Sequence, residues 1–244
     1  MASLHGKYLS LLGASTSTFH GYSDDGQYHS SLPLNVAYYP KDFLTDVKDT
    51  WWMRVIDDLG LRLCVNNSFS GSCITTTVDG KEKAGCMNRA TALHNDRLGI
   101  EPDIIVLIIG GNDALRGYEV GTYRDKGDIY DPVTGTYIGD CTAFGAAYAT
   151  MVHKVKARYE NAAIYVCSML HWQPKKHDKG LLQYNEVIKQ IAKEFGVTYV
   201  DLYHETAISP ETADTYFHTD GVHPNKHGFL EMASCIKKYL QKNA

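Results

Sequence analysis

The chain has 244 residues, of which 44% are hydrophobic, and its formal net charge is −4 at pH 7. A chain of this size can bury a substantial core, and its scattered Lys and Arg residues form no basic stripe of the kind that binds nucleic acid. Because no apolar run approaches the roughly 18 residues needed to cross a bilayer, we expect a soluble protein without a membrane partner.

Five short apolar runs have the length of buried strands, and segments with helical periodicity lie between them. The expected strands are Tyr8–Leu12, Leu61–Val65, Ile104–Ile109, Ala163–Ser168 and Thr198–Leu202. The expected helices are Trp51–Leu59, Gly145–Tyr159, Leu181–Phe195 and His227–Leu240. This alternation predicts a parallel sheet covered by helices on both faces, and such sheets bind ligands beyond the carboxyl ends of their strands.

The first expected strand runs into the segment LLGASTSTFHGY, residues 11–22, in which hydroxyl residues follow a glycine. An ordinary turn explains this pattern if Gly13 supplies backbone freedom and Ser15 or Thr16 caps a helix. The alternative is that one hydroxyl is a nucleophile, and then Ser15 and Ser17 are the candidates. Neither a GxGxxG nor a Walker A phosphate loop follows this strand, which argues against a nucleotide-binding protein.

Two more polar turns follow the second and third strands. NNSFSGSCIT, residues 66–75, contains Gly71, whose unhindered N–H can donate to an anion. LIIGGNDAL, residues 107–115, places Asn112 where its amide can point at a developing negative oxygen. Asp113 is expected to be structural and to bond backbone amides in its own turn. Both segments are also ordinary turn compositions.

Residues 115–139 contain several Gly, Asp and Tyr residues and little periodicity, which predicts an irregular insertion at the carboxyl end of the third strand. Loops of this length are often binding elements. Trp172 follows the fourth strand, so it is a candidate for the wall of a binding site as well as for the core.

The segment TDGVHPNKHGF, residues 219–229, places Asp220 three positions before His223. A carboxylate at this spacing can hold the imidazole Nδ1–H, which leaves Nε2 to act as a general base. The alternatives are a capping turn with a surface histidine, and a metal site formed by His218, His223 and His227. No Cys or acidic cluster at matching spacing supports the metal.

The six cysteines show no CxxC spacing, and Cys64 and Cys167 lie inside apolar runs. Buried free thiols are therefore expected, with a Cys73–Cys86 disulfide as the alternative. Free thiols slightly favour a cytoplasmic protein over a secreted one whose signal peptide has been removed.

The chain resembles the SGNH hydrolases, also called the GDSL esterase/lipase superfamily, in four blocks that occur in the family's order and approximate spacing. These blocks are LLGASTSTFHGY, NNSFSGS, IIGGNDAL and DGVHPNKHG, and the resemblance spans residues 8 to about 240. It implies a flavodoxin-like α/β/α sandwich with a five-stranded parallel sheet, in one SGNH-like domain over residues 1–244. It also implies that no cofactor and no metal is needed.

Position by position, the resemblance implies a catalytic triad in which Ser15 is the nucleophile, His223 is the general base and Asp220 orients His223. The oxyanion hole would be formed by the Ser15 N–H, the Gly71 N–H and the Asn112 side chain. The chain departs from the family block Gly-Asp-Ser, because it has Ala14 before Ser15. That family Asp is not the acid of the triad, so its loss alters the support of the nucleophile without removing a catalytic role.

The expected function is therefore a serine esterase that hydrolyses short acyl esters, chiefly acetyl esters, of a carbohydrate or another polar alcohol. The composition of residues 115–139 favours the polar alcohol, because sugar rings stack on tyrosine. The alternatives are a lipase, lysophospholipase or thioesterase of the same superfamily, and an inactive carbohydrate-binding homologue. The sequence leaves the oligomeric state open.

Overall fold

The protein is seen in a computed structural model, which describes residues 3–22, 36–38, 44–77, 84–121, 141–172 and 180–243. Most of the predicted insertion, residues 122–139, lies outside this described part. The described strands are β1 (Tyr8–Gly13), β2 (Arg62–Ser68), β3 (Ile104–Ile108), β4 (Ala163–Cys167) and β5 (Thr198–Val200). The α-helices are α1 (Trp51–Leu59), α3 (Gly111–Leu115), α5 (Phe144–Arg158), α7 (Leu181–Phe195), α8 (Leu202–Glu205), α9 (Ala213–Tyr216) and α10 (Lys226–Lys242). Short 3₁₀ helices are η1 (Ser15–Ser17), η3 (Val47–Asp49) and η4 (Asn88–Thr91).

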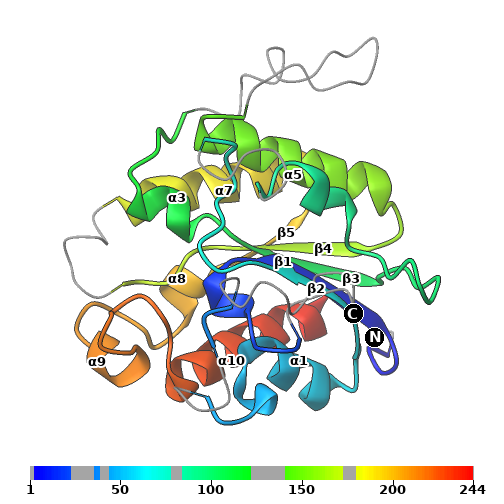
Figure 1. The fold of residues 1–244 in the computed structure, drawn as a ribbon, viewed down its shortest axis with the longest axis horizontal. Coiled ribbons are helices and arrows are strands. Elements are labelled where there is room, and N and C mark those ends of the chain that lie inside the picture. Colours follow the sequence, from blue (N-terminus) through cyan, green and yellow to red (C-terminus); the bar gives the residue numbers. More distant parts are fainter. Residues whose placement is uncertain are drawn as a thin grey trace.

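The strands form one parallel sheet in the order β2-β1-β3-β4-β5, which is the order of flavodoxin-like folds. Helices α5 and α7 cover one face of the sheet, and α1 and α10 cover the other (Figure 1). The predicted five-stranded α/β sandwich is therefore confirmed. Among the described residues, no helix is both long and apolar enough to cross a membrane.

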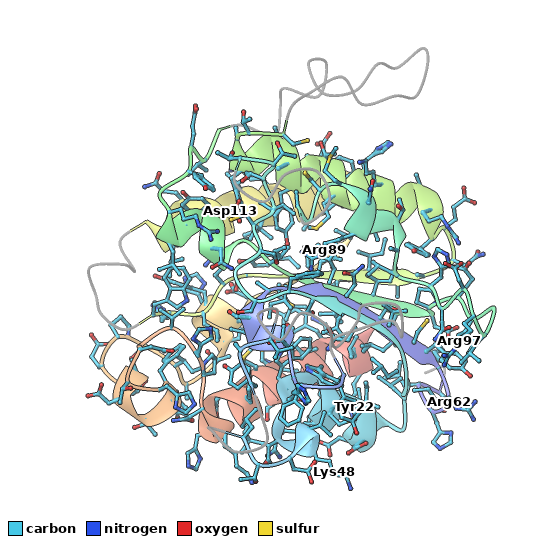
Figure 2. All side chains as sticks on the ribbon, viewed as in Figure 1. Tyr22, Lys48, Arg62, Arg89, Arg97 and Asp113 are labelled. Atoms are coloured by element: carbon cyan, nitrogen blue, oxygen red, sulfur yellow. The ribbon has the colours of Figure 1, made fainter. Side chains whose placement is uncertain are left out.

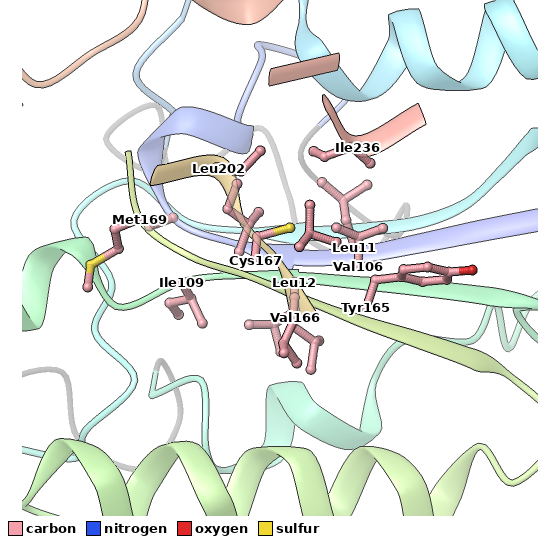
Figure 3. Close-up of a cluster of buried hydrophobic side chains, with 14 of the residues drawn as sticks. Leu11, Leu12, Val106, Ile109, Tyr165, Val166, Cys167, Met169, Leu202 and Ile236 are labelled. Carbon is pink, nitrogen blue, oxygen red and sulfur yellow. The ribbon is translucent and has the colours of Figure 1, made fainter. Parts of the chain in front are cut away.

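The central strands are buried on both faces, which explains why they read as continuous apolar runs rather than alternating ones. Every residue of β3 is buried. Leu11 and Cys167 point toward Ile236 of α10, whereas Ile109 and Val166 point toward α5 (Figure 3). The sheet thus forms the middle of one hydrophobic core.

Polar side chains set the ends of several elements. The Thr50 hydroxyl accepts a hydrogen bond from the Met53 N–H at the start of α1, and Gly60 ends this helix in the left-handed conformation. In β1, the Ser10 hydroxyl accepts from the Val65 N–H at 3.2 Å, where the register between β1 and β2 shifts. A side chain therefore contributes to the pairing of β1 with β2, in addition to the backbone hydrogen bonds.

The last strand is shorter than predicted. Thr198–Leu202 was expected to be extended, but β5 ends at Val200 and Leu202 begins α8. The Asp201 carboxylate accepts from the His204 N–H at 3.1 Å and so caps this helix. The apolar run continues through Leu202 because this residue is fully buried at the start of α8, so hydrophobicity does not mark the strand end.

We predict that Gly13→Ala destabilises the fold, because β1 ends where two other side chains approach the backbone. A Cβ at Gly13 would lie 2.6 Å from Ser17 Oγ and 3.0 Å from Ser68 Oγ. Overpacking of this kind typically costs about 1–3 kcal/mol. Urea unfolding measures the loss. The control is Gly180→Ala, since a Cβ there would meet nothing within 4 Å; equal stability of the two variants would contradict the prediction.

Candidate active site

Ser15 opens the short helix η1 directly after β1. The N–H of Ser17 donates to the Ala14 carbonyl at 3.0 Å, and the Thr18 N–H and hydroxyl both donate to the Ser15 carbonyl, at 3.1 and 2.7 Å. This tight turn leaves the Ser15 side chain on the wall of a pocket. Ser17 is fully buried instead and accepts a hydrogen bond from the Trp51 indole at 3.3 Å. Of the two candidate hydroxyls, Ser15 is the one that lines the pocket.

The pocket lies at the carboxyl ends of the strands, as expected for an open parallel sheet. Its polar wall includes Ser15, Thr16 and Asn112, and Val222 lines it from the loop before α10. Most of the remaining wall is apolar and includes Ile108, Ile109, Leu115, Met169, Leu170 and Trp172. The pocket therefore combines a hydroxyl and an amide with a hydrophobic surface.

Asp220 and His223 form a close pair. The His223 Nδ1 lies 2.7 Å from Asp220 Oδ2, and Asp220 Oδ1 accepts hydrogen bonds from the backbone N–H groups of Val222 and His223, both at 2.9 Å. Burial raises the pKa of Asp220, but the hydrogen bonds from the backbone and the imidazole outweigh it, so the pKa lies below its ordinary value. Asp220 is therefore ionised at neutral pH and can fix the orientation of the imidazole.

A small closed loop holds this pair. The His218 N–H donates to the His223 carbonyl at 2.9 Å, and Phe217 pairs with Pro224 in an antiparallel bridge. Tyr38 supports the loop from a distant part of the sequence: its hydroxyl donates to the Pro224 carbonyl at 3.1 Å, and its ring meets the His223 ring edge-on. Burial, and then the charge of Asp220, raise the pKa of Tyr38 well above its ordinary value, so the hydroxyl keeps its proton.

His223 Nε2 faces away from Asp220 and is enclosed. It has no hydrogen-bond partner among the described residues, so Ser15 Oγ does not bond to it in this structure. Its chain neighbour Val222 lines the same pocket as Ser15. Hydrogen bonds between catalytic groups are often long without substrate and tighten when it binds, so this arrangement is compatible with a base that acts on Ser15.

Asn112 contacts Ser72, the residue that follows Gly71. The Asn112 Nδ2 group donates one hydrogen to the Ser72 carbonyl at 2.9 Å, which leaves the other hydrogen available at the pocket wall. Gly71 has a positive φ of 80°, and its carbonyl accepts from Arg116 at 3.1 Å. Gly71 itself does not line the pocket, so the structure brings Ser15 and Asn112 together there and places Gly71 one residue from the Asn112 contact.

Asp113 is fully buried and structural, but its partners differ from those expected. Its carboxylate accepts from the backbone N–H groups of Ile74 and Thr75, at 2.9 and 3.1 Å, and from the Thr75 hydroxyl at 2.9 Å. These groups belong to the loop after β2 and not to its own turn. Burial raises the pKa of Asp113 despite these hydrogen bonds. Asp113 therefore ties α3, which carries Asn112, to the loop that carries Gly71.

Trp172 is both packed and at the site. It is 5% exposed and lines the pocket, and a Cβ added to Gly111 would lie 3.2 Å from its indole ring. Trp172 is therefore both part of the core and part of the pocket wall.

Neither the metal site nor the disulfide that the sequence left open is seen in the described part of the chain. No three His, Cys, Asp or Glu side chains gather there in a way that could hold a metal ion, and His227 is exposed at the start of α10. All six cysteines are free and buried, so Cys73 and Cys86 form no disulfide.

Tyr38 and Arg89 contact the site but were not predicted from the sequence. Arg89 is 4% exposed and donates to the carbonyl of Gly13, two residues before Ser15, at 2.7 Å. Neither residue belongs to a motif, and both reach the site across long stretches of chain, so no local pattern marks them.

Comparison with known proteins gives three results. The family model described as GDSL-like Lipase/Acylhydrolase matches residues 7–240. Similar solved structures include a candidate GDSL-like lipase from Bacteroides ovatus ATCC 8483, at 26% identity and a TM-score of 0.70, covering 97% of this chain and 99% of that one. An acetylxylan esterase from Geobacillus stearothermophilus shares the fold at 18% identity and a TM-score of 0.58, with 98% and 95% covered. No curated protein matches the sequence significantly.

We predict that Asp220→Asn removes a pH-dependent part of the stability. A carboxylate whose folded pKa is lowered contributes stability that is present above its unfolded pKa, about 3.9, and is lost as pH falls through the lower folded value. Because the pKa of Asp220 is lowered, the stability gap between wild type and Asp220→Asn should be largest at pH 5–8 and shrink below about pH 4. Urea unfolding across pH measures this gap.

The matched control for this experiment is Asp57→Asn, since Asp57 is an exposed carboxylate in α1. This variant removes one negative charge without removing a hydrogen bond to the loop that carries His223. If the two variants give the same pH profile, Asp220 does not gain stability from its hydrogen bonds.

Proposed function

Because the chain belongs to the GDSL-like lipase/acylhydrolase family, and is therefore a carboxylic ester hydrolase, we propose that it is a serine esterase with Ser15, His223 and Asp220 as its triad. Its substrates are short acyl esters, chiefly acetyl esters, of a carbohydrate or another polar alcohol. One observation carries the proposed triad. Asp220 lies 2.7 Å from His223, and Val222, the residue before His223, lines the pocket that also contains Ser15 and Asn112.

In the first step, Ser15 Oγ attacks the carbonyl carbon of the ester while His223 Nε2 takes the hydroxyl proton. Asp220 accepts the Nδ1–H and stabilises the imidazolium that forms. Its lowered pKa supports this role, because the carboxylate stays ionised. The proton on His223 then passes to the leaving alcohol, which departs and leaves an acyl-serine.

The tetrahedral intermediate places a negative charge on the former carbonyl oxygen. The Ser15 N–H, the Gly71 N–H and the second Asn112 amide hydrogen are the donors that we assign to it. Two features support the Ser15 and Asn112 donors: the first N–H groups of a helical turn have no partner within it, and the Ser72 carbonyl already accepts one Asn112 hydrogen. Water then attacks the acyl-serine, with His223 as the base again, and releases the acid.

The size of the acyl group depends on the apolar wall of the pocket. The apolar wall formed by Leu115, Met169 and Trp172 suits an acyl chain, and Gly111 lines the pocket beside the Trp172 ring. The polar alcohol rests on the composition of residues 115–139. At 18% identity, the acetylxylan esterase supports the fold and not its substrate.

The apolar wall also favours a second function, namely a lipase, lysophospholipase or thioesterase that accepts longer acyl chains. Leu115 is exposed at the pocket and could contact the outer part of such a chain. Chain-length preference separates the two functions.

The proposed chemistry is tested with p-nitrophenyl acetate, butyrate and octanoate. We expect the wild type to prefer acetate and Ser15→Ala to be inactive while keeping its circular dichroism spectrum. Ser17→Ala is the control, because Ser17 is buried away from the pocket, and it should retain activity. A fluorophosphonate should label Ser15, as read by peptide mass mapping.

Three outcomes would revise the proposed function. Preference for octanoate selects the lipase alternative. Fluorophosphonate labelling of Ser17 would identify Ser17 as the nucleophile instead of Ser15. A folded wild type that takes no label and hydrolyses none of the three esters supports an inactive binding homologue.

We predict that Asn112→Ala lowers kcat by about 10²–10³, the usual cost of removing one oxyanion donor. The variant also loses the hydrogen bond to the Ser72 carbonyl, so its thermal unfolding must be measured beside its kinetics. Asn161→Ala, at an exposed turn, is the control. A folded Asn112→Ala enzyme with wild-type kcat would remove Asn112 from the oxyanion hole.

A further inference from the structure

Arg89 is a buried arginine near the proposed oxyanion hole. It belongs to η4 and is 4% exposed. Figure 2 shows it in the interior, whereas Arg62 and Arg97 lie at the periphery of the molecule. Burying a guanidinium is costly unless its donors are satisfied, so its partners indicate what it holds in place.

Its hydrogen bonds reach two segments that are far apart in the sequence. Nη2 donates to the carbonyls of Gly13 and Asn67, both at 2.7 Å. Nη1 donates to the Ser72 hydroxyl at 3.0 Å, and Nε donates to Asn67 Oδ1 at 3.1 Å. The guanidinium also lies over the Phe69 ring, 5.1 Å from its centre. These acceptors are backbone carbonyl, amide and hydroxyl oxygens of β1, β2 and the loop after β2.

Each contacted segment carries one of the proposed oxyanion donors. Gly13 precedes Ser15 by two residues, at the end of β1. Ser72 follows Gly71, and its carbonyl accepts the amide hydrogen of Asn112 at 2.9 Å. The Ser72 hydroxyl, which Arg89 contacts, also donates to the Phe69 carbonyl at 2.9 Å and so fixes the turn around Gly71. One side chain therefore links the supports of all three donors.

We propose that Arg89 is a positioning residue of the oxyanion hole, which holds the Ser15 turn and the Gly71–Ser72 turn in register. This role rests on the proposed esterase function. A planar guanidinium can serve several acceptors in fixed directions, whereas a lysine ammonium offers the charge without the fork. Stabilisation of this kind acts on the transition state more than on the neutral ester.

The test uses the full-length protein with Arg89→Met, Arg89→Lys and the control Arg97→Met. Circular dichroism and thermal unfolding establish that each variant is folded. Steady-state hydrolysis of p-nitrophenyl acetate gives kcat and KM. Inhibition by a small alkylboronic acid, which forms a tetrahedral anion on a nucleophilic serine, gives a Ki that reports on the oxyanion hole.

For Arg89→Met we expect kcat to fall by up to about 10²–10³, the cost of losing one oxyanion donor, with KM changed less than about twofold. The Ki of the boronic acid should rise by a similar factor. Arg89→Lys should recover part of the loss, and Arg97→Met should match the wild type. A purely structural role would lower stability without this matched change in kcat and Ki.

The outcomes separate the role of Arg89 from the esterase function itself. If the wild type is active and folded Arg89→Met keeps its kcat, or loses kcat with an unchanged Ki, the positioning role is wrong and the esterase function stands. If neither Arg89 variant folds, Arg89 is structural only. If the wild type hydrolyses no ester and takes no phosphonate, the proposed function fails and the role of Arg89 fails with it.

Discussion

Loops at the carboxyl edge of a parallel sheet carry backbone N–H and C=O groups that no neighbouring strand pairs, and burying them unpaired costs free energy. Here two buried side chains, one an acceptor and the other a donor, bind such groups. Asp113 accepts from the N–H groups of Ile74 and Thr75, and Arg89 donates to the carbonyls of Gly13 and Asn67. A carboxylate has only acceptors and a guanidinium only donors, so each binds the kind of group that the other cannot. The shape of the pocket depends on this division.

The strand order determines which loops these side chains can join. Because β1 lies between β2 and β3, the turn that carries Ser15 has the Gly71 loop on one side and Asn112 on the other. Asp113 follows Asn112 in α3 and binds the loop after β2, and Arg89 binds that same loop and the end of β1. These side chains add to the backbone hydrogen bond from the Phe69 N–H to the Gly13 carbonyl, and together they hold three loops separated by tens of residues as one unit.

Much of the fold could be predicted because its signals are local. Trp51–Leu59 and Leu181–Phe195 have the bounds expected from their periodicity, since each helix ends at a glycine in the left-handed conformation. The end of β5 could not be predicted, because a capping carboxylate at Asp201 and not a change in hydrophobicity starts α8. For the site, the pairing of Asp220 with His223 follows from their spacing of three. The partners of Asp113 lie 38 and 39 residues away and those of Arg89 up to 76, so no pattern in the chain could identify them.

The oxyanion donors and the general base of the proposed site are held in place in different ways, and their chemical roles explain the difference. The oxyanion donors must already point at the place where charge develops, because reorienting them during the reaction would cost the free energy they are meant to supply. Buried contacts of Arg89 and Asp113 provide that fixed geometry. The base lies instead on a short loop held by Tyr38 and by a half-exposed Asp220, and its Nε2 makes no hydrogen bond with any described residue. A base tolerates this, because its hydrogen bond to the nucleophile can tighten when substrate fills the pocket, whereas a loose oxyanion hole cannot be corrected in the same way.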